Sequence, residues 1–410
     1  MLIPEKRIAE FEALGFGMFV HWGLYSLMGE GEWVQAHSNI PSVEYAKLMD
    51  SFTASKFDAK YWVGVAKAAG AKYITFTTRH HDGFSLYDTC GLNKFDSVHS
   101  PCGRDIVREL VDACNDEGIV PMLYHTTLDW RNQDFHENFS KYLQYLRDSV
   151  EILCTNYGKI GGFWFDGNWS KKDADWEEDA LYSLIRKHQP DAIIVNNTGL
   201  QERGKRGHPQ IDSVTFEQGR PMPMDRTSHS KYLAAEMCHT LNSHWGYGAS
   251  DYNYKSLPQL IETLCACRKV GANYLLNIGP DGDGKIPLLQ EALLRGIGSW
   301  LRETGNVIYT AKPCGIMDGG KNFALKEGNR LYFFIHDLPV QGNKNVIIGE
   351  GRMGNTYFSN VGYKLKNIRW TDRDEELKFV QNGNELEIVC TGYPYGKHLA
   401  VRVAVADIEE

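Results

Sequence analysis

The chain has 410 residues, 42% of them hydrophobic and 23% charged, which is the composition of a folded protein and excludes an intrinsically disordered one. Its length suffices for one large domain and a smaller one. With 44 basic and 52 acidic residues the net charge is −8, which leaves no basic surface for a phosphate backbone, so we expect a neutral substrate and no nucleic-acid partner.

Apolar runs alternate with amphipathic segments from the N-terminus to about residue 280, a pattern typical of strand and helix units around a parallel sheet. The predicted strands cover residues 17–22, 73–78, 120–125, 161–166, 192–197, 212–217, 234–239 and 273–279. Apolar residues at spacings of three and four predict helices between them. Eight such strands predict a (β/α)8 TIM-like barrel, and the short spacing around the sixth and seventh predicts a distorted one.

The texture of the sequence changes after a last helical segment at residues 288–305. From about residue 312, apolar and polar residues alternate with period two, and Gly or Asn pairs separate the runs. We therefore predict a catalytic barrel over residues 1–310 and a C-terminal antiparallel β-sandwich over residues 311–410.

The segment FWFDG at residues 163–167 predicts a buried strand that delivers the carboxylate of Asp166 at its C-terminal end. Aromatic neighbours would lower the local dielectric, and Gly167 would let the backbone turn sharply after the charge. The alternative is an Asp that caps the next helix. Because no strong helix pattern begins at Gly167, we favour a functional site.

Polar side chains gather at the predicted strand ends, which lie at the catalytic face of such a barrel. They are His21, Trp22, His80, His81, Asp82, Tyr124, His125, Asp166, Asn196, Asn197, Glu217 and Glu236. One interpretation is a divalent metal site of a hydrolase. The other is sugar binding by neutral imidazoles with cleavage by two carboxylates. We favour the second, because His80 and His81 cannot both point inward from a regular strand.

Six segments resemble glycoside hydrolase family 29, the α-L-fucosidases, in the same order along residues from about 8 to 310. They are GFGMFVHWGLYS (15–26), GEW (31–33), YWVGVAKAAGAKYITFTTRHHDGFSLYDT (61–89), DIVRELVDACNDEGI (105–119), WFDG (164–167) and GANYLLNIGPDGDGKI (271–286). The resemblance implies a distorted barrel followed by a β-sandwich. It also implies retaining hydrolysis of terminal α-L-fucosides from oligosaccharides or glycoconjugates, with no metal and no organic cofactor.

The resemblance also implies roles for individual residues. Asp166 matches the family's nucleophile. The positions that match residues gripping the fucose ring are His21, Glu32, Trp33, His80, His81, Tyr124 and Trp164, with His125 as a further candidate. Taken from the sequence alone, Glu32 has the alternative reading of a solvated loop acid.

Two glutamates are candidates for the acid/base. Glu217 lies at the predicted end of the sixth strand, where several members carry theirs, and Glu236 matches a segment that usually reads Trp-Glu. We favour Glu217. In a departure from the family, Thr198 lies near the register of a supporting arginine, and we hypothesise that Arg220 compensates for its loss.

The predicted mechanism is double displacement by Asp166 and Glu217. Alternatives are a related retaining enzyme acting on α-L-galactosides or β-D-galactosides, and a carbohydrate-binding homologue without catalysis. No run approaches the ~18 apolar residues of a membrane span. The sequence as given predicts a cytoplasmic protein, or a periplasmic or secreted one if a signal peptide was removed. A homo-oligomer is compatible with the sequence.

Overall fold

The computed structural model describes residues 2–197, 207–219, 230–340, 354–396 and 400–409. The chain forms two compact units, one comprising the residues up to Tyr254 with Asn273–Leu294, the other Lys255–Ala272 with the residues from Arg295. These units interleave in the sequence, whereas a boundary at residue 310 is a single cut. The boundary at residue 310 stays a prediction.

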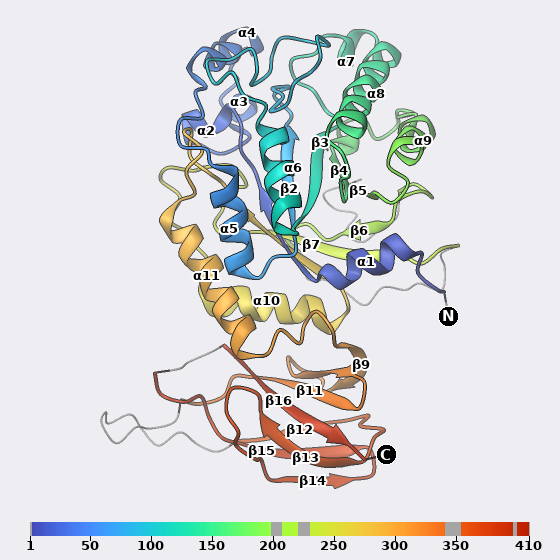
Figure 1. Ribbon diagram of the computed structural model, residues 1–410, viewed down its shortest axis with the longest axis vertical. Helices are drawn as coiled ribbons and strands as arrows, with labels where there is room; N and C mark the ends of the chain where they lie inside the picture. The colour runs from blue at the N-terminus through green and yellow to red at the C-terminus, as the bar shows by residue number, and fades with distance from the viewer. Residues whose placement is uncertain (1, 198–206, 220–229, 341–353, 397–399, 410) are drawn as a thin grey trace. The chain divides into compact units, whose positions relative to one another are not determined.

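The first unit contains a closed barrel of eight parallel strands in chain order (Figure 1). The strands are β1 (Phe16–Val20), β2 (Tyr73–Arg79), β3 (Val120–Thr126), β4 (Gly162–Asp166), β5 (Ile193–Asn197), β6 (Ser213–Thr215), β7 (Ala234–Thr240) and β8 (Asn273–Ile278). Each coincides with a predicted strand, with ends that differ by at most two residues. The predicted barrel is confirmed.

Helices follow most barrel strands, and each forms where one apolar face and a suitable cap coincide. In α6 (Ile106–Glu117), for example, the side chain of Asp105 accepts from the backbone N–H of Arg108, and the helix ends at Gly118 with φ 69°. The other helices of this unit are α1 (Lys6–Leu14), α2 (Tyr25–Met28), α3 (Val34–His37), α4 (Ser42–Tyr45), η1 (Ala46–Ser51), α5 (Ala59–Ala69), α7 (Asp134–Glu137), α8 (Phe139–Asn156), η2 (Asn168–Lys171) and α9 (Glu178–His188). Between β5 and β7, the described residues contain no helix.

The barrel is weakest in its pairing at β6. This strand has three residues and pairs with β5 through the single register pair Val195 and Ser213. The distortion of the barrel is therefore confirmed.

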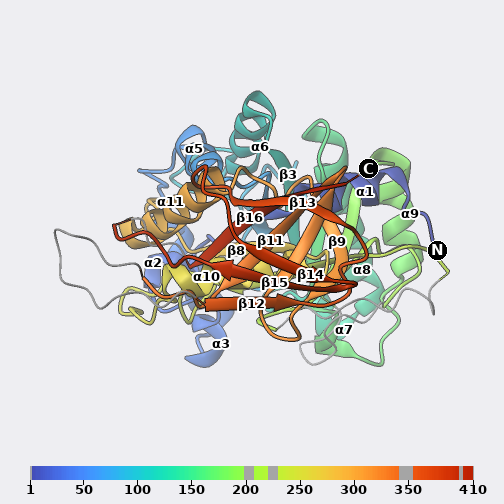
Figure 2. The ribbon, with the colours of Figure 1, turned by 90° about the horizontal axis from the view of Figure 1, so that it is seen from below.

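The second unit contains two antiparallel sheets (Figure 2), one of five strands in the order β13-β16-β11-β10-β9 and one of three in the order β12-β15-β14. Their strands are β9 (Lys312–Met317), β10 (Phe323–Glu327), β11 (Arg330–His336), β12 (Gly354–Phe358), β13 (Leu365–Trp370), β14 (Phe379–Asn382), β15 (Glu385–Cys390) and β16 (Val401–Ile408). Inward residues of both sheets, such as Phe333 and Phe358, form one apolar core. The predicted β-sandwich is confirmed.

Two further helices complete the chain. Helix α10 (Leu257–Lys269) begins with a capping box between Ser256 and Gln259, and α11 (Leu288–Glu303) ends where the predicted last helix ends, to within two residues. None of the helices in the described residues has the length and apolar composition that crossing a bilayer requires.

Candidate active site

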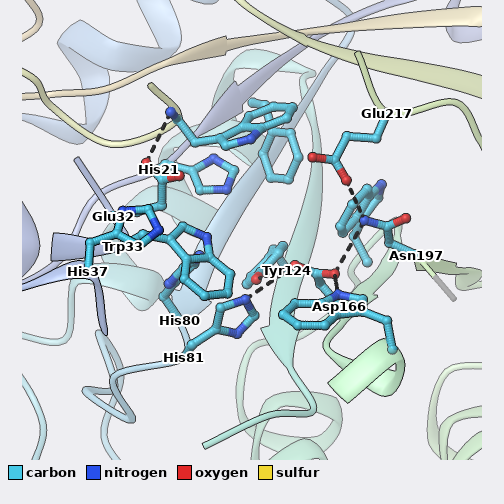
Figure 3. A pocket seen from close by; sticks show the side chains of 14 residues that line it. His21, Glu32, Trp33, His37, His80, His81, Tyr124, Asp166, Asn197 and Glu217 are labelled. Atoms are coloured by element: carbon cyan, nitrogen blue, oxygen red, sulfur yellow. Dashed lines mark hydrogen bonds and ion pairs between the residues drawn. The ribbon is translucent and has the colours of Figure 1, made fainter. Parts of the chain in front are cut away.

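A cavity of about 270 Å³ opens where the barrel strands end (Figure 3). Residues from several strands of the barrel and from the loops that follow them line this cavity. Its volume is enough for one small molecule. The lining residues are Phe19, His21, Glu32, Trp33, His37, His80, His81, Tyr124, Trp164, Asp166, Trp169, Asn197, Glu217 and Trp245. All seven predicted sugar-binding residues are among them, together with Asp166 and Glu217.

Asp166 ends β4, and its carboxylate is held from both sides. Oδ1 accepts from the indole N–H of Trp169 at 2.9 Å, and Oδ2 accepts from the hydroxyl of Tyr124 at 3.1 Å. Gly167 follows with φ 124°, and a Cβ there would lie 2.6 Å from the backbone nitrogen of Leu128. The sharp turn thus requires glycine. Asp166 does not cap the next helix, because the N-cap of η2 is Gly167.

The surroundings of Asp166 favour its ionised form. Burial by itself would raise the pKa of Asp166, but the contact with His81, 3.5 Å from Nε2 to Oδ2, and the donors Trp169 and Tyr124 outweigh burial and lower that pKa. A carboxylate that is charged at neutral pH, partly enclosed and aimed into a cavity can act as a nucleophile.

Asn197 contacts the carboxylates of both Asp166 and Glu217. It lies directly opposite Asp166 in the pairing of β4 with β5. Its Nδ2 donates to Oδ1 of Asp166 at 3.3 Å and to Oε2 of Glu217 at 2.8 Å. Because both oxygens lie close to the same nitrogen, they are at most about 6 Å apart.

Four histidines line the cavity, of which His81 contacts Asp166 and His21 and His80 lie beside each other. Burial lowers the pKa of His21 to about 3, and burial together with His81 and His21 lowers the pKa of His80 well below its usual range. Nδ1 of His21 lies 2.6 Å from Oδ1 of Asn277, an oxygen that only accepts, so the hydrogen of neutral His21 sits on Nδ1. Nε2 of His21 is then an acceptor.

His80 and His81 both line the cavity, as their predicted role in sugar binding requires, so the argument from strand alternation that only one of them could point inward does not hold here. That argument assumed a regular strand, but β2 ends at Arg79 and both histidines follow it. Their ring centroids are 4.2 Å apart. The alternation of side chains across a strand does not apply past its end.

Glu32 and Trp33 reach the cavity from the segment before α3. Glu32 is buried, and its Oε2 accepts from the backbone N–H groups of Trp245 at 3.1 Å and Gly246 at 2.7 Å. The alternative of a solvated loop acid is therefore wrong. Trp33 is half-buried and stacks on His37 and Trp169, with ring centroids 5.7 and 5.9 Å away.

Glu236 does not line the cavity. It is fully buried inside the barrel, where it accepts from the hydroxyl of Tyr73 at 2.5 Å and the indole N–H of Trp164 at 2.9 Å. Burial raises the pKa of Glu236 to about 7 in spite of these two donors. Of the two candidate acids, only Glu217 stands beside Asp166.

Five lining residues were not predicted to be catalytic or sugar-binding: Phe19, His37, Trp169, Trp245 and Asn197, the last of which was placed only among the polar residues at strand ends. Phe19 carried a usable signal, because it lies two residues before His21 and so on the same face of β1. His37, four residues after Trp33, carried another. His125 lies outside the cavity, with its Nε2 3.0 Å from the hydroxyl of Ser149, and Thr198 and Arg220 lie outside the described residues.

The family model for α-L-fucosidase matches residues 5–306. The chain belongs to glycoside hydrolase family 29. Human tissue α-L-fucosidase is 31% identical over 379 residues, 82% of this chain and 77% of the human protein. The structure of α-L-fucosidase isoenzyme 1 from Paenibacillus thiaminolyticus has a TM-score of 0.83 at 30% identity and covers 99% of both chains. That of the Thermotoga maritima α-fucosidase in complex with fucose has a TM-score of 0.74 at 25% identity, covering 99% of this chain and 100% of that one.

Membership of the fucosidase family also establishes the class of reaction, which is hydrolysis of a glycosidic bond. This protein is a glycoside hydrolase that acts on fucosides. The barrel, the sandwich and the cavity at the strand ends accord with that class.

Proposed function

We propose that this protein is a retaining exo-α-L-fucosidase in which Asp166 is the nucleophile and Glu217 the acid/base. The observation that supports the proposal is the shared nitrogen of Asn197, which brings Oδ1 of Asp166 and Oε2 of Glu217 to within about 6 Å of each other. Retaining enzymes hold their carboxyl groups about 5 to 5.5 Å apart, whereas inverting enzymes need about 6.5 to 9.5 Å for a water. The geometry therefore favours double displacement.

In the first step, ionised Asp166 attacks the anomeric carbon of fucose. A bond forms between its carboxylate oxygen and that carbon while the glycosidic C–O bond breaks, and protonated Glu217 gives its hydrogen to the leaving oxygen. The products are a fucosyl ester on Asp166, a free alcohol and an ionised Glu217. The lowered pKa of Asp166 keeps the nucleophile charged before attack.

In the second step, water hydrolyses the ester. Ionised Glu217 takes a proton from the water, whose oxygen bonds to the anomeric carbon as the bond to Asp166 breaks. Fucose leaves with its original anomeric configuration, and both carboxyl groups return to their starting states. Two inversions at one carbon give net retention.

The cavity matches a single sugar ring with hydroxyls on one side and apolar surface on the other. Nε2 of neutral His21 can accept from one hydroxyl, and the ring of His80 lines the cavity beside it. The rings of Phe19 and Trp245 can cover the C5 methyl group. At about 270 Å³ the cavity is smaller than the ~300–1,000 Å³ of pockets for larger ligands, which favours one terminal residue.

The first test replaces Asp166 by Gly and measures turnover of an aryl α-L-fucoside. Loss of the nucleophile should lower kcat by about 10³-fold or more. Added azide should restore turnover and yield a fucosyl azide of inverted configuration, because azide then attacks once from the side of the missing carboxylate. As a matched control, Asp173→Gly changes an exposed aspartate seven residues away and should keep parental kinetics. Activity of Asp166→Gly within tenfold of the parent would remove Asp166 from the mechanism.

The second test separates the two glutamates. Glu217→Ala should lose about 10²–10⁴-fold on a fucoside with a poor leaving group and much less on one with an activated leaving group. Azide should then give a fucosyl azide of retained configuration. Glu236→Gln should show neither behaviour, because Glu236 is enclosed in the barrel. The opposite result would assign the acid/base to Glu236.

A further inference from the structure

We propose that Asn197 is a positioning residue that sets the separation of the two carboxylates and determines which oxygen of Glu217 carries the proton. The inference rests on the proposed roles of Asp166 and Glu217. It begins from a geometric fact: one nitrogen, Nδ2 of Asn197, donates to a carboxylate oxygen of each residue. Figure 3 shows Asn197 between them, joined to both.

The amide of Asn197 is itself held rigidly. The residue is buried, with 3% of its surface exposed, and it lies in β5 in direct register with Asp166 of β4. Backbone pairing therefore sets the distance from Asn197 to Asp166, while the side chain reaches on to Glu217, which follows the short strand β6. Since β6 is joined to β5 by one register pair, the side-chain bridge supplies a link that the backbone provides only weakly.

The number of hydrogens on its amide nitrogen determines how many acceptors Asn197 can bind. An amide nitrogen carries two hydrogens, and Nδ2 of Asn197 makes two contacts, one to an oxygen of each carboxylate. Two hydrogens suffice for these two contacts. Asn197 thus acts on the substrate through Asp166 and Glu217.

The bond to Oε2 also bears on proton delivery. A protonated carboxyl group has one hydroxyl and one carbonyl oxygen, and the carbonyl oxygen is the better acceptor. Because Oε2 accepts from Asn197, the proton of Glu217 is directed to Oε1, the oxygen that faces the cavity in Figure 3. After the proton leaves, the same N–H stabilises the carboxylate. Asn197 therefore donates a hydrogen bond to Glu217 both when Glu217 is protonated and when it is ionised.

The experiment compares Asn197→Ala with the parent on two aryl α-L-fucosides, one with a poor and one with an activated leaving group. We expect kcat/KM to fall about 10²-fold on the poor leaving group and less than tenfold on the activated one, because proton donation matters only for the former. Inhibition by free fucose should stay within threefold. Loss of donors to two carboxylates should also move both limbs of the pH profile of kcat/KM upward by about one pH unit.

Two more variants complete the design. Asn197→Asp keeps the shape but offers no second hydrogen, so we expect a loss at least as large as that of Asn197→Ala. Asn196→Ala alters the neighbouring residue of β5, whose amide donates to the hydroxyl of Tyr182 at 2.8 Å and to Glu178 at 3.3 Å and does not contact Asp166 or Glu217. This variant should keep both the leaving-group dependence and the pH limbs of the parent. This control reports any general weakening of β5.

Three outcomes would overturn the inference: unchanged kinetics and pH limbs in Asn197→Ala, equal losses on both leaving groups, or a weakening of fucose inhibition that matches the loss in kcat/KM. The last two would make Asn197 a structural or substrate-binding residue. Failure of the proposed function is distinguishable, because it would appear as near-parental activity of Asp166→Gly, or of Glu217→Ala on the fucoside with the poor leaving group, regardless of how the Asn197 variants behave.

Discussion

Among single residues, Glu236 shows how burial and hydrogen bonding compete. It lies inside the barrel with no exposed surface, and burial raises its pKa to about 7 although Tyr73 and Trp164 both donate to it. Its usual pKa is about 4.5. Folding therefore favours the protonated form of Glu236, and the stability that this form contributes is present below pH 4.5 and lost as pH rises through 7.

We expect Glu236→Gln to remove this pH dependence, because glutamine stays neutral at every pH. The free energy of unfolding of the parent, relative to the variant, should fall by up to about 3 kcal/mol between pH 4.5 and 8. Urea unfolding of both proteins at four pH values across that range measures the difference, which cancels the titration of all other groups. A difference that does not change with pH would show that Glu236 is ionised throughout or that Trp164 and Tyr73 rearrange.

Among the elements, strands β1 and β2 pair where β1 has a glycine, and the ring of a tyrosine from β2 occupies the space that a side chain would fill. Gly17 of β1 is opposite Tyr73 of β2, and a Cβ on Gly17 would lie 2.4 Å from Cζ of the Tyr73 ring. The ring crosses the barrel over this glycine and carries its hydroxyl to Glu236. Gly17 on β1 thus leaves space for the ring of Tyr73 on β2, and this ring places its hydroxyl against the buried carboxyl group of Glu236.

Gly17→Ala should destabilise the protein by about 1 to 3 kcal/mol, because the ring of Tyr73 must move and Glu236 loses a donor. Gly64→Ala is the matched control: Gly64 is exposed in helix α5, and a Cβ there meets nothing within 4 Å. Helix propensity predicts that this change stabilises by about 0.5 to 1 kcal/mol. Urea unfolding compares the two. Equal effects of the same sign would contradict the packing argument.

For the whole molecule, two kinds of buried group affect stability in mild acid: histidines whose pKa is lowered by burial and carboxyl groups whose pKa is raised by it. Burial lowers the pKa of His21 to about 3 and that of His336 to about 4, and it lowers the pKa values of His80 and His125 well below their usual range. These four rings are neutral when folded. Their contribution to stability is present above pH 6.5 and is lost as pH falls, because the unfolded rings take up protons.

Acids in the described residues oppose this trend: burial raises the pKa of Asp105 above its ordinary value, that of Asp82 to about 6 and that of Glu236 to about 7, so Asp82 and Glu236 release protons on unfolding at pH 5.5. Four histidines against two acids predict a net uptake of about two protons at pH 5.5. Calorimetric unfolding in buffers of different ionisation enthalpy measures that number. Net release, or no exchange, would contradict the assignment of neutral buried histidines.

Much of the fold could be predicted from local patterns. The eight barrel strands are apolar runs bounded by turn residues, and the sandwich strands alternate with period two, so their existence required no long-range knowledge. The polar residues that line the cavity at strand ends followed from the barrel geometry, as Asp166 and Glu217 illustrate. The domain boundary, by contrast, depends on which element packs with which, and residues 255–272 group with the second unit in spite of their place in the chain.

The site was less predictable where side-chain direction decides. His80 and His81 face the cavity together because both follow the end of β2 at Arg79, where the alternation of side chains along a strand no longer applies. Glu236 matched a family segment as well as Glu217 did, but its place on β7 directs it into the barrel. Asn197 carried no motif, because its importance lies in two contacts to residues 31 and 20 positions away.

The sequence by itself determined the class of fold and the chemical types that surround the cavity, because apolar periodicity and strand-end polar residues are local properties of a chain. Only the tertiary structure decided which acid stands beside Asp166 and which amide joins the two. Those relations depend on the register of β4, β5 and β6 around a closed barrel. Register arises from the packing of all strands at once, and no single segment encodes it.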